Sequence, residues 1–467
     1  MYLRKITFTI LSSIICLSVY GQEITGQWNG ILKVQGIQLR LVFHIEKTDI
    51  GYSATMDSPD QGALGIPVTS TTFENATLTL IIPNAKIEYD GVRGKDNIIV
   101  GTFRQAGQTF PMNLSKEFVE KEKLVRPQEP VKPYPYYEEE VTFANDKAGI
   151  DLTGTLTLPK KDGVYPAVIL ITGSGPQNRD EELLGHKPFL VLADYLTRNG
   201  IAVLRFDDRG TASSKGDFAT ATTMDFSTDV QAAVDYLTER KEINQKKIGL
   251  IGHSEGGIVA PIVAAASKDV AFIVLMAGTG IQGDQLLLLQ QELIGRVSGM
   301  TEEELQGTKD FNKGAFDLVI GSTDTEQLTK DLTTYLKKGF EDNPEEIPES
   351  MREDEFVGLQ VQQLVSPWML YFIKYNPALI LQKVKCPVLA INGEKDLQVP
   401  PKENLSAIAA ALKKGGNKKF TTKELPGLNH LFQECTTGSP DEYSEIEQTI
   451  SPVALSEILL WIQMQTK

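Results

Sequence analysis

A serine flanked by glycines, at the junction of an apolar run and a helix-like run, constrains the fold most. Residues Lys247–Gly257 read Lys-Ile-Gly-Leu-Ile-Gly-His-Ser-Glu-Gly-Gly. Glycines there allow a turn so tight that side chains would collide with the neighbouring strand and helix. The serine hydroxyl is then exposed at the apex. A short G-x-S-x-G pattern also arises by chance in ordinary connections, but its position predicts that Ser254 is a nucleophile.

A serine nucleophile needs a base, and the chain holds only His44, His186, His253 and His430. The first lies in an alternating segment far upstream, the second heads a probable helix, and the third should point away from the serine. His430 follows a strand-like run, Lys418–Leu425, through a short loop. Because the C-terminal end of a parallel strand is where such a group is expected, we predict His430 as the base. The alternative is a polar loop residue.

The base needs a carboxylate that holds its tautomer and stabilises its charged form. Asp396 follows a buried-type strand, Cys386–Asn392, and is our candidate. Glu394, in the same loop, is the competitor. The chain order of the three groups is then Ser254, Asp396, His430.

An oxyanion formed at the serine needs two backbone N–H donors. Glu255 follows the nucleophile at a predicted helix N-terminus, where N–H groups point outward. The second donor should come from the loop Thr172–Asp180, which follows the strand-like run Pro166–Ile171. Within that loop Ser174 is the first choice and Gly173 the second.

Several ordered motifs resemble those of α/β-hydrolases, and more narrowly bacterial carboxylesterases of the serine-aminopeptidase-like group. They are Gly173–Asp180 (Gly-Ser-Gly-Pro-Gln-Asn-Arg-Asp), His186–Phe189 (His-Lys-Pro-Phe) and Asp207–Gly210 (Asp-Asp-Arg-Gly). The resemblance covers the chain from about Tyr137 onward and implies a mostly parallel sheet with the Ser–Asp–His order found above. Ala212 departs from the pattern, because relatives usually have a glycine there, so the geometry of that loop is in question.

The resemblance and the candidate residues together predict a serine hydrolase that cleaves short-chain carboxylic esters through an acyl-enzyme. A serine peptidase acting on short peptides is the alternative. Metal-ligand spacing, phosphate loops and dinucleotide motifs do not occur in the sequence, so we expect neither metal nor cofactor.

The length of 467 residues leaves room for two domains. Residues 22–116 contain short alternating segments separated by turn residues, which predicts a small antiparallel β domain, lipocalin-like or a sandwich. We expect its core to be filled rather than to hold a ligand, although it could dock the enzyme on a polymer or the cell envelope. A Pro-rich linker, 117–136, then leads to the α/β-hydrolase domain, 137–467.

An inserted helical cap is predicted at about residues 281–385, where four amphipathic segments follow one another. Caps roof the substrate pocket of such enzymes. Its most aromatic piece, Ser366–Phe372, makes Trp368 and Tyr371 candidate pocket residues. Packing of the cap on the body is the alternative interpretation of these two rings.

The formal net charge of −15 argues against nucleic acid and anionic membrane surfaces as partners. Residues 1–21 are typical of a signal peptide: a basic start, an apolar stretch too short to span a bilayer, and small residues before a cleavage site after Gly21. We therefore expect a secreted or periplasmic protein with no further membrane segment. A disulfide between Cys386 and Cys435 is not expected, because they should lie at opposite ends of the sheet.

Overall fold

The computed structural model describes residues 24–34, 37–61, 63–94, 96–105, 108–120, 126–344, 347 and 351–467. The predicted signal peptide lies outside these ranges. The chain divides into two compact units, the first ending at Lys121 and the second beginning at Glu122.

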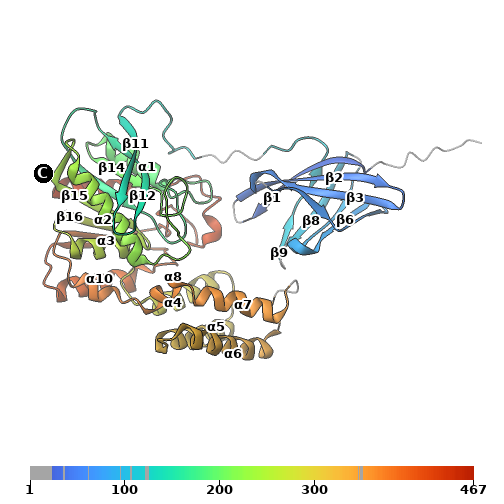
Figure 1. The fold of residues 1–467 in the computed structure, drawn as a ribbon. Coiled ribbons are helices and arrows are strands. Elements are labelled where there is room, and N and C mark those ends of the chain that lie inside the picture. Colours follow the sequence, from blue (N-terminus) through green and yellow to red (C-terminus); the bar gives the residue numbers. More distant parts are fainter. Residues whose placement is uncertain are drawn as a thin grey trace, which may run out of the picture. The chain divides into compact units, whose positions relative to one another are not determined.

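The first unit is a strongly curved antiparallel sheet with the strand order β4-β3-β2-β1-β10-β8-β7-β6-β5, and β9 pairs with β8 (Figure 1). Because β3 approaches β5 and β4 approaches β6, the sheet nearly closes on itself. The predicted barrel-like β domain is thus confirmed. Its strands are β1 (Gly26–Val34), β2 (Ile37–Thr48), β3 (Gly51–Ser58), β4 (Ala63–Val68), β5 (Ser70–Glu74), β6 (Thr77–Ile82), β7 (Ile87–Arg93), β8 (Ile98–Gln105), β9 (Gln108–Pro111) and β10 (Leu114–Ser115).

Large side chains fill the interior of this barrel. Trp28, Phe43, Tyr89 and Phe103 are at most 1% exposed. The Tyr89 hydroxyl donates to the carbonyl of Met112 at 3.2 Å, which satisfies the one polar group that this ring carries inward. These side chains form a packed core, as the sequence led us to expect.

The second unit contains an eight-stranded sheet with the order β11-β12-β14-β13-β15-β16-β17-β18. The first two strands pair antiparallel to their neighbours, and the six from β14 onward run parallel. This order confirms the predicted α/β-hydrolase fold. The strands are β11 (Tyr137–Asn145), β12 (Ile150–Leu158), β13 (Tyr165–Ile171), β14 (Ala202–Phe206), β15 (Ile243–His253), β16 (Val270–Met276), β17 (Val388–Gly393) and β18 (Phe420–Leu425).

Helices cover both faces of this sheet (Figure 1). On one face α1 (Pro188–Arg198) and α11 (Pro452–Gln465) pack on the buried side chains of the central strands. On the other, α2 (Thr223–Glu239), α3 (Gly256–Ala266) and α10 (Pro401–Lys414) do the same. The parallel strands are therefore apolar on both sides, as their near-continuous hydrophobic runs require.

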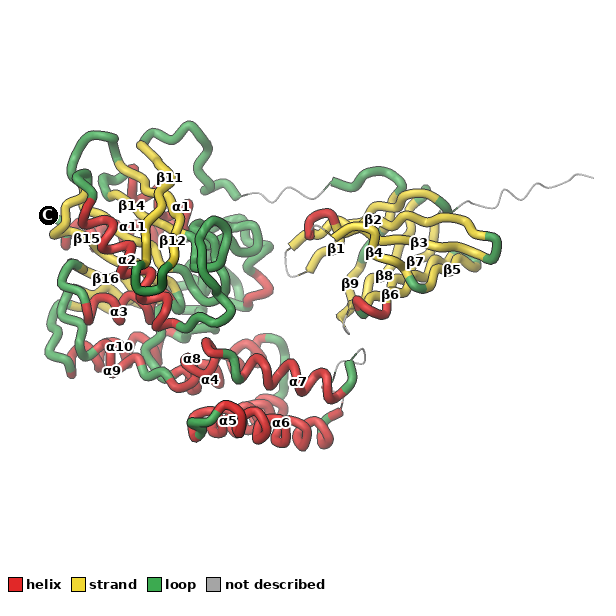
Figure 2. Tube along the Cα trace, in the orientation of Figure 1, coloured by secondary structure: helices red, strands yellow, loops and turns green. Residues whose placement is uncertain are grey.

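A helical cap is inserted between β16 and β17 (Figure 2). It has a hydrophobic core of its own. Four helices of this segment begin with side-chain caps, at Thr301, Asp324, Ser366 and Asn376. The segment consists of α4 (Gly283–Val297), α5 (Glu302–Gly321), α6 (Thr325–Asp342), α7 (Glu353–Leu364) and α8 (Pro367–Lys374), followed by α9 (Pro377–Leu381).

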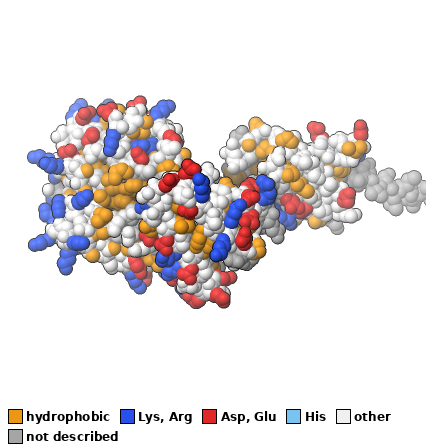
Figure 3. Space-filling view, turned by 60° about the horizontal axis from the view of Figure 1, so that its bottom comes forward, with side chains coloured by type: hydrophobic (Ala, Val, Ile, Leu, Met, Phe, Trp, Pro, Cys, Tyr) orange, Lys and Arg blue, Asp and Glu red, His pale blue; other side chains and the backbone are white. Residues whose placement is uncertain are grey.

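The face shown in Figure 3 carries positively charged, negatively charged and apolar side chains, and the apolar ones form patches between the charged ones. Within the described ranges, none of the helices has the length and hydrophobicity needed to span a bilayer.

Candidate active site

Ser254 lies at the apex of a tight turn between β15 and α3. Its backbone has φ 51°, in the left-handed region that non-glycine residues rarely adopt. A Cβ at Gly252 would lie 2.0 Å from the carbonyl oxygen of Gly256, and one at Gly256 would lie 2.2 Å from that of Ile171. Both glycines are therefore required by the close approach of neighbouring backbone, and the turn holds the serine partly exposed.

His430 and Asp396 are in contact. Nδ1 of His430 lies 2.9 Å from Oδ2 of Asp396, and both side chains are buried. The other carboxylate oxygen, Oδ1, accepts from the backbone N–H groups of Gln398 and Val399 at 2.9 and 2.8 Å. Glu394 is turned elsewhere, since its Oε2 accepts from the N–H of Gly427. The carboxylate that orients the imidazole is thus that of Asp396.

His253 joins the turn to the histidine loop. Its ring centroid is 4.9 Å from that of His430, and its Nε2 lies 3.0 Å from the carbonyl oxygen of His430. Its Nδ1 lies 2.9 Å from Oε1 of Glu181. Burial acts to lower the pKa of His253, but the Glu181 carboxylate outweighs it and the net pKa is raised. The ring therefore bridges three loops that are distant in sequence.

Glu181 is a residue that sequence reasoning missed. It is 5% exposed, and its Oε1 accepts from the N–H of Gly173 at 2.7 Å as well as facing His253. The pattern offered no signal for it, because its partner His253 is 72 residues away in the sequence.

The hydrogen bond from the N–H of Gly173 to Glu181 affects which N–H groups can stabilise an oxyanion. It occupies the N–H of Gly173, whereas no backbone hydrogen bond of the described residues uses the N–H of Ser174 or Glu255. Glu255 stands at the N-terminus of α3, where such groups point away from the helix. Ser174 and Glu255 are therefore the better pair of candidate donors.

The Asp-Asp-Arg turn after β14 holds the loop Thr172–Asp180 in place. Asp207 makes a bidentate ion pair with Arg179, with distances of 3.0 and 2.7 Å. Asp208 accepts from the hydroxyl of Thr172 at 2.7 Å and from the N–H of Gln177 at 2.9 Å. Both ends of the loop are thus anchored to this turn.

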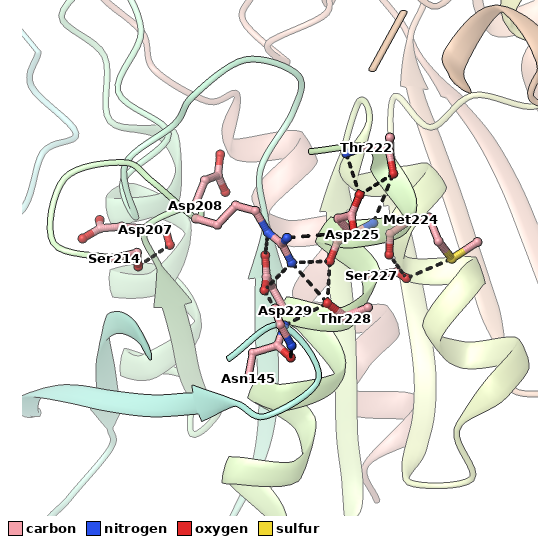
Figure 4. Close-up of polar contacts among 12 residues, drawn as sticks. Asn145, Asp207, Asp208, Ser214, Thr222, Met224, Asp225, Ser227, Thr228 and Asp229 are labelled. Atoms are coloured by element: carbon pink, nitrogen blue, oxygen red, sulfur yellow. Dashed lines mark hydrogen bonds and ion pairs between the residues drawn. The ribbon is translucent and has the colours of Figure 1, made fainter. Parts of the chain in front are cut away.

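The same turn is tied to helix α2. Arg209 donates two hydrogen bonds to Asp229, at 2.7 and 2.9 Å, and Asn145 donates to the same carboxylate at 2.7 Å (Figure 4). Ala212, the departure from the family pattern, has φ 47°. The loop thus takes the left-handed conformation that a glycine would adopt at lower cost.

Asp208 should make stability depend on pH. Burial raises the pKa of its carboxyl to about 8, against an ordinary value of 3.8. The folded state therefore keeps a proton that the unfolded state releases, and the stability this contributes is lost as pH rises from about 4 to 8. We expect Asp208→Asn to raise Tm, relative to the wild type, more at pH 8 than at pH 5.

Asp207→Asn is the matched control. Burial acts to raise the pKa of Asp207, but the bonds from Arg179 and Ser213 outweigh it and the net pKa is lowered. Its stabilising effect is complete above the unfolded pKa, so this variant should lower Tm equally at both pH values. A Tm difference for Asp208→Asn that does not change with pH would contradict the prediction.

The two candidate pocket residues lie on cap helix α8. The indole Nε1 of Trp368 donates to Oε1 of Glu255 at 2.8 Å. Burial and the nearby Glu255 raise the pKa of Tyr371. The Trp368 ring therefore contacts the residue that follows Ser254.

A groove of about 750 Å³ lies elsewhere, between the β11–β12 turn and helices α2 and α3. None of the predicted site residues lines it. In the part of the chain that the structure describes, no three His, Cys, Asp or Glu side chains are grouped so as to hold a metal ion.

The chain matches a known protein family. The family model described as "Serine aminopeptidase, S33" matches residues 187–434, more than half of the chain. The chain belongs to this family. The predicted resemblance to esterase-like α/β-hydrolases is thereby confirmed.

Relatives of this S33-family chain include esterases. Esterase EstD of Thermotoga maritima is 29% identical over 67% of this chain, and the match spans 65% of that protein, slightly less than two thirds of its length. An esterase structure from Pyrococcus furiosus is 17% identical, with a TM-score of 0.42 over 73% of this chain and 97% of that one. Est1E from Butyrivibrio proteoclasticus with ferulic acid bound is 19% identical, with a TM-score of 0.40 over 70% and 99%.

Two other histidines have structural partners. His186 is 1% exposed, and its ring nitrogens each lie 3.0 Å from Thr449 or the carbonyl of Tyr443. Burial, followed by the positive charge of Arg126, lowers its pKa to about 4, so the ring is neutral at physiological pH. His44 lies on β2 of the barrel beside Asp57.

The end of the Pro-rich linker is anchored on the hydrolase unit. The Arg126 guanidinium donates to the carbonyls of Leu184, Ser444 and Ile446 at 2.9 to 3.1 Å. Gln128 accepts from the N–H groups of Thr449 and Ile450. Since Thr449 contacts His186, which in turn contacts Gln433 at 3.1 Å, this anchor supports the loop that carries His430.

Two shortened chains test whether the end of the linker supports the hydrolase unit. A chain that starts at Glu122 should fold and keep turnover of soluble esters, because the residues predicted to do the chemistry lie downstream. A chain that starts at Tyr137 should lose Tm and activity, since removing Arg126 and Gln128 leaves several partly buried carbonyl and N–H groups without these partners. Equal Tm and kcat in the two truncations would contradict a supporting role for residues 126–136.

Proposed function

We propose that the protein is a serine hydrolase that cleaves short-chain carboxylic esters, with Ser254, Asp396 and His430 as its catalytic triad. The observation that carries this proposal is the buried His430–Asp396 contact of 2.9 Å beside a tight turn that holds Ser254 at its apex. The relation to Esterase EstD supports the choice of reaction.

In the proposed mechanism His430 takes the proton of Ser254 through the nitrogen that does not face Asp396. The serine oxygen then attacks the ester carbonyl, and the N–H groups of Glu255 and Ser174 stabilise the oxyanion. His430 protonates the leaving alcohol, and water attacks the acyl-enzyme by the same route. Asp396 keeps the imidazole oriented and stabilises its charged form throughout.

Two carboxylates near the serine bear on the peptidase alternative, because an aminopeptidase must neutralise the substrate's α-ammonium group. Asp180 forms an ion pair with the buried Arg205. Glu255 is 4% exposed and accepts from Thr223 and Trp368. Because both are already engaged inside the protein, ester hydrolysis is the better-supported reaction.

The test compares kcat/KM for two substrate series on one preparation. We expect p-nitrophenyl acetate to butyrate to be cleaved in preference to long-chain esters, since a helical cap that contacts the residue after Ser254 should leave little room for long acyl groups. Aminoacyl and dipeptidyl p-nitroanilides should be poor substrates. A p-nitroanilide that exceeds the best ester by about tenfold, roughly 1.4 kcal/mol in transition-state binding, would favour the peptidase.

We also propose that the protein is exported and that cleavage after Gly21 leaves Gln22 as its first residue. The basic and apolar segments at the start of the sequence support this. N-terminal sequencing of the protein from the periplasm or medium tests it, and an uncleaved protein found in the cytoplasm would contradict it.

A further inference from the structure

The backbone and the side chain of Glu255 face different parts of the hydrolase unit. Its backbone follows the nucleophile and supplies a candidate oxyanion donor, while its side chain is 4% exposed and reaches a helix of the cap. Oε1 accepts from the hydroxyl of Thr223 at 2.6 Å and from the indole of Trp368 at 2.8 Å. Burial raises the pKa of the Glu255 carboxyl, and these two hydrogen bonds oppose it.

The two donors come from different parts of the hydrolase unit. Thr223, fully buried, begins helix α2 of the body. Trp368 lies on α8 of the cap, and its ring stacks on Phe372 at 5.0 Å. The carboxylate therefore links body, nucleophile turn and cap through a single oxygen atom.

Apolar packing accompanies this link. Phe372 of α8, together with Leu286 of α4, joins a buried cluster with Ile258 and Ile262 of α3 and with Val399, which follows Asp396. Apolar contacts are non-directional and allow a helix to slide. The hydrogen bond from Trp368 to Glu255 has a defined length and angle, so it adds a directional contact between α8 and the body to this packing.

We propose that the Trp368–Glu255 hydrogen bond sets the length of acyl chain that the active site accepts, by holding α8 against the residue after the nucleophile. This inference rests on the proposed esterase function. Glu255 and Trp368 act here as positioning residues. Without the bond, the Trp368 indole loses its acceptor and Glu255 loses one of its two donors in a partly buried site, and α8 moves outward so that longer chains fit.

The experiment measures kcat/KM for p-nitrophenyl butyrate and octanoate with the full chain. Trp368→Phe keeps an aromatic ring but removes the indole N–H, and Glu255→Leu removes the acceptor. Each should raise the octanoate-to-butyrate ratio by about tenfold, the size expected for one such hydrogen bond. Glu255→Gln keeps a carbonyl acceptor and should hold the ratio within about twofold of the wild type.

Two controls separate this role from general destabilisation. Tyr335→Phe removes a hydrogen bond within the cap, to the carbonyl of Phe311 at 2.8 Å, and should leave the ratio unchanged. Thr223→Val removes the donor on the body side and should do the same. A ratio that is unchanged in Trp368→Phe, or that shifts equally in Thr223→Val, would overturn the inference.

A second measurement distinguishes a failure of this inference from a failure of the proposed function. Labelling rates with short-chain and octyl fluorophosphonates report chain-length preference at Ser254 without any ester turnover. A wild type that is labelled but cleaves no ester overturns the proposed function, and the ratio of the two labelling rates still decides the inference. A wild type that neither probe labels overturns both.

Discussion

Replacing Ser254 with alanine should lower kcat for ester hydrolysis by ~10^6-fold, because the acyl-enzyme can no longer form. His430→Ala should cost nearly as much, since groups that act as one unit are not additive. The double variant should therefore be no worse than either single one. The measurement is kcat on p-nitrophenyl butyrate together with labelling by a fluorophosphonate probe.

A serine and a histidine elsewhere in the chain serve as controls. Ser267 is the C-cap of helix α3, which begins next to Ser254, and it is partly exposed. His44 lies on the barrel. Ser267→Ala and His44→Ala should keep wild-type turnover and labelling. Residual kcat of a few per cent in Ser254→Ala would mean that another residue is the nucleophile.

Asp396→Asn should lower kcat by about 10^4-fold without unfolding the protein. Asparagine still offers one oxygen to the N–H groups of Gln398 and Val399, which now bond to Asp396 Oδ1. Its amide nitrogen then faces Nδ1 of His430, which favours the tautomer that cannot accept the serine proton.

Glu394→Gln is the matched test of this assignment. The Glu394 side chain accepts one bond, from the N–H of Gly427, and a glutamine oxygen can accept the same bond. Its kcat should stay within about twofold of the wild type, as is usual for a surface change that keeps its hydrogen bond. If Glu394→Gln shows the deeper loss, Asp396 is not the orienting acid.

The fold class was predicted from the sequence by two routes. The resemblance of several ordered motifs to those of α/β-hydrolases implied the mostly parallel sheet, and short alternating segments predicted the separate β domain. The glycines around Ser254 predict the tight turn, because the contacts that exclude a Cβ arise within a single strand–turn–helix unit and the strand beside it. The chain order of the candidate catalytic groups followed from the strand-and-loop positions of Ser254, Asp396 and His430, and the family resemblance agreed with it.

By itself, then, the sequence determined the nucleophile turn, the order of the candidate catalytic groups and the place of the cap. Only the tertiary structure decided which carboxylate faces His430, which N–H groups near the oxyanion are free, and which cap residue reaches the active site. His253 and His430 are 177 residues apart, and Glu255 and Trp368 are 113 apart. Such contacts depend on how whole elements pack, and no periodicity or local turn records that packing.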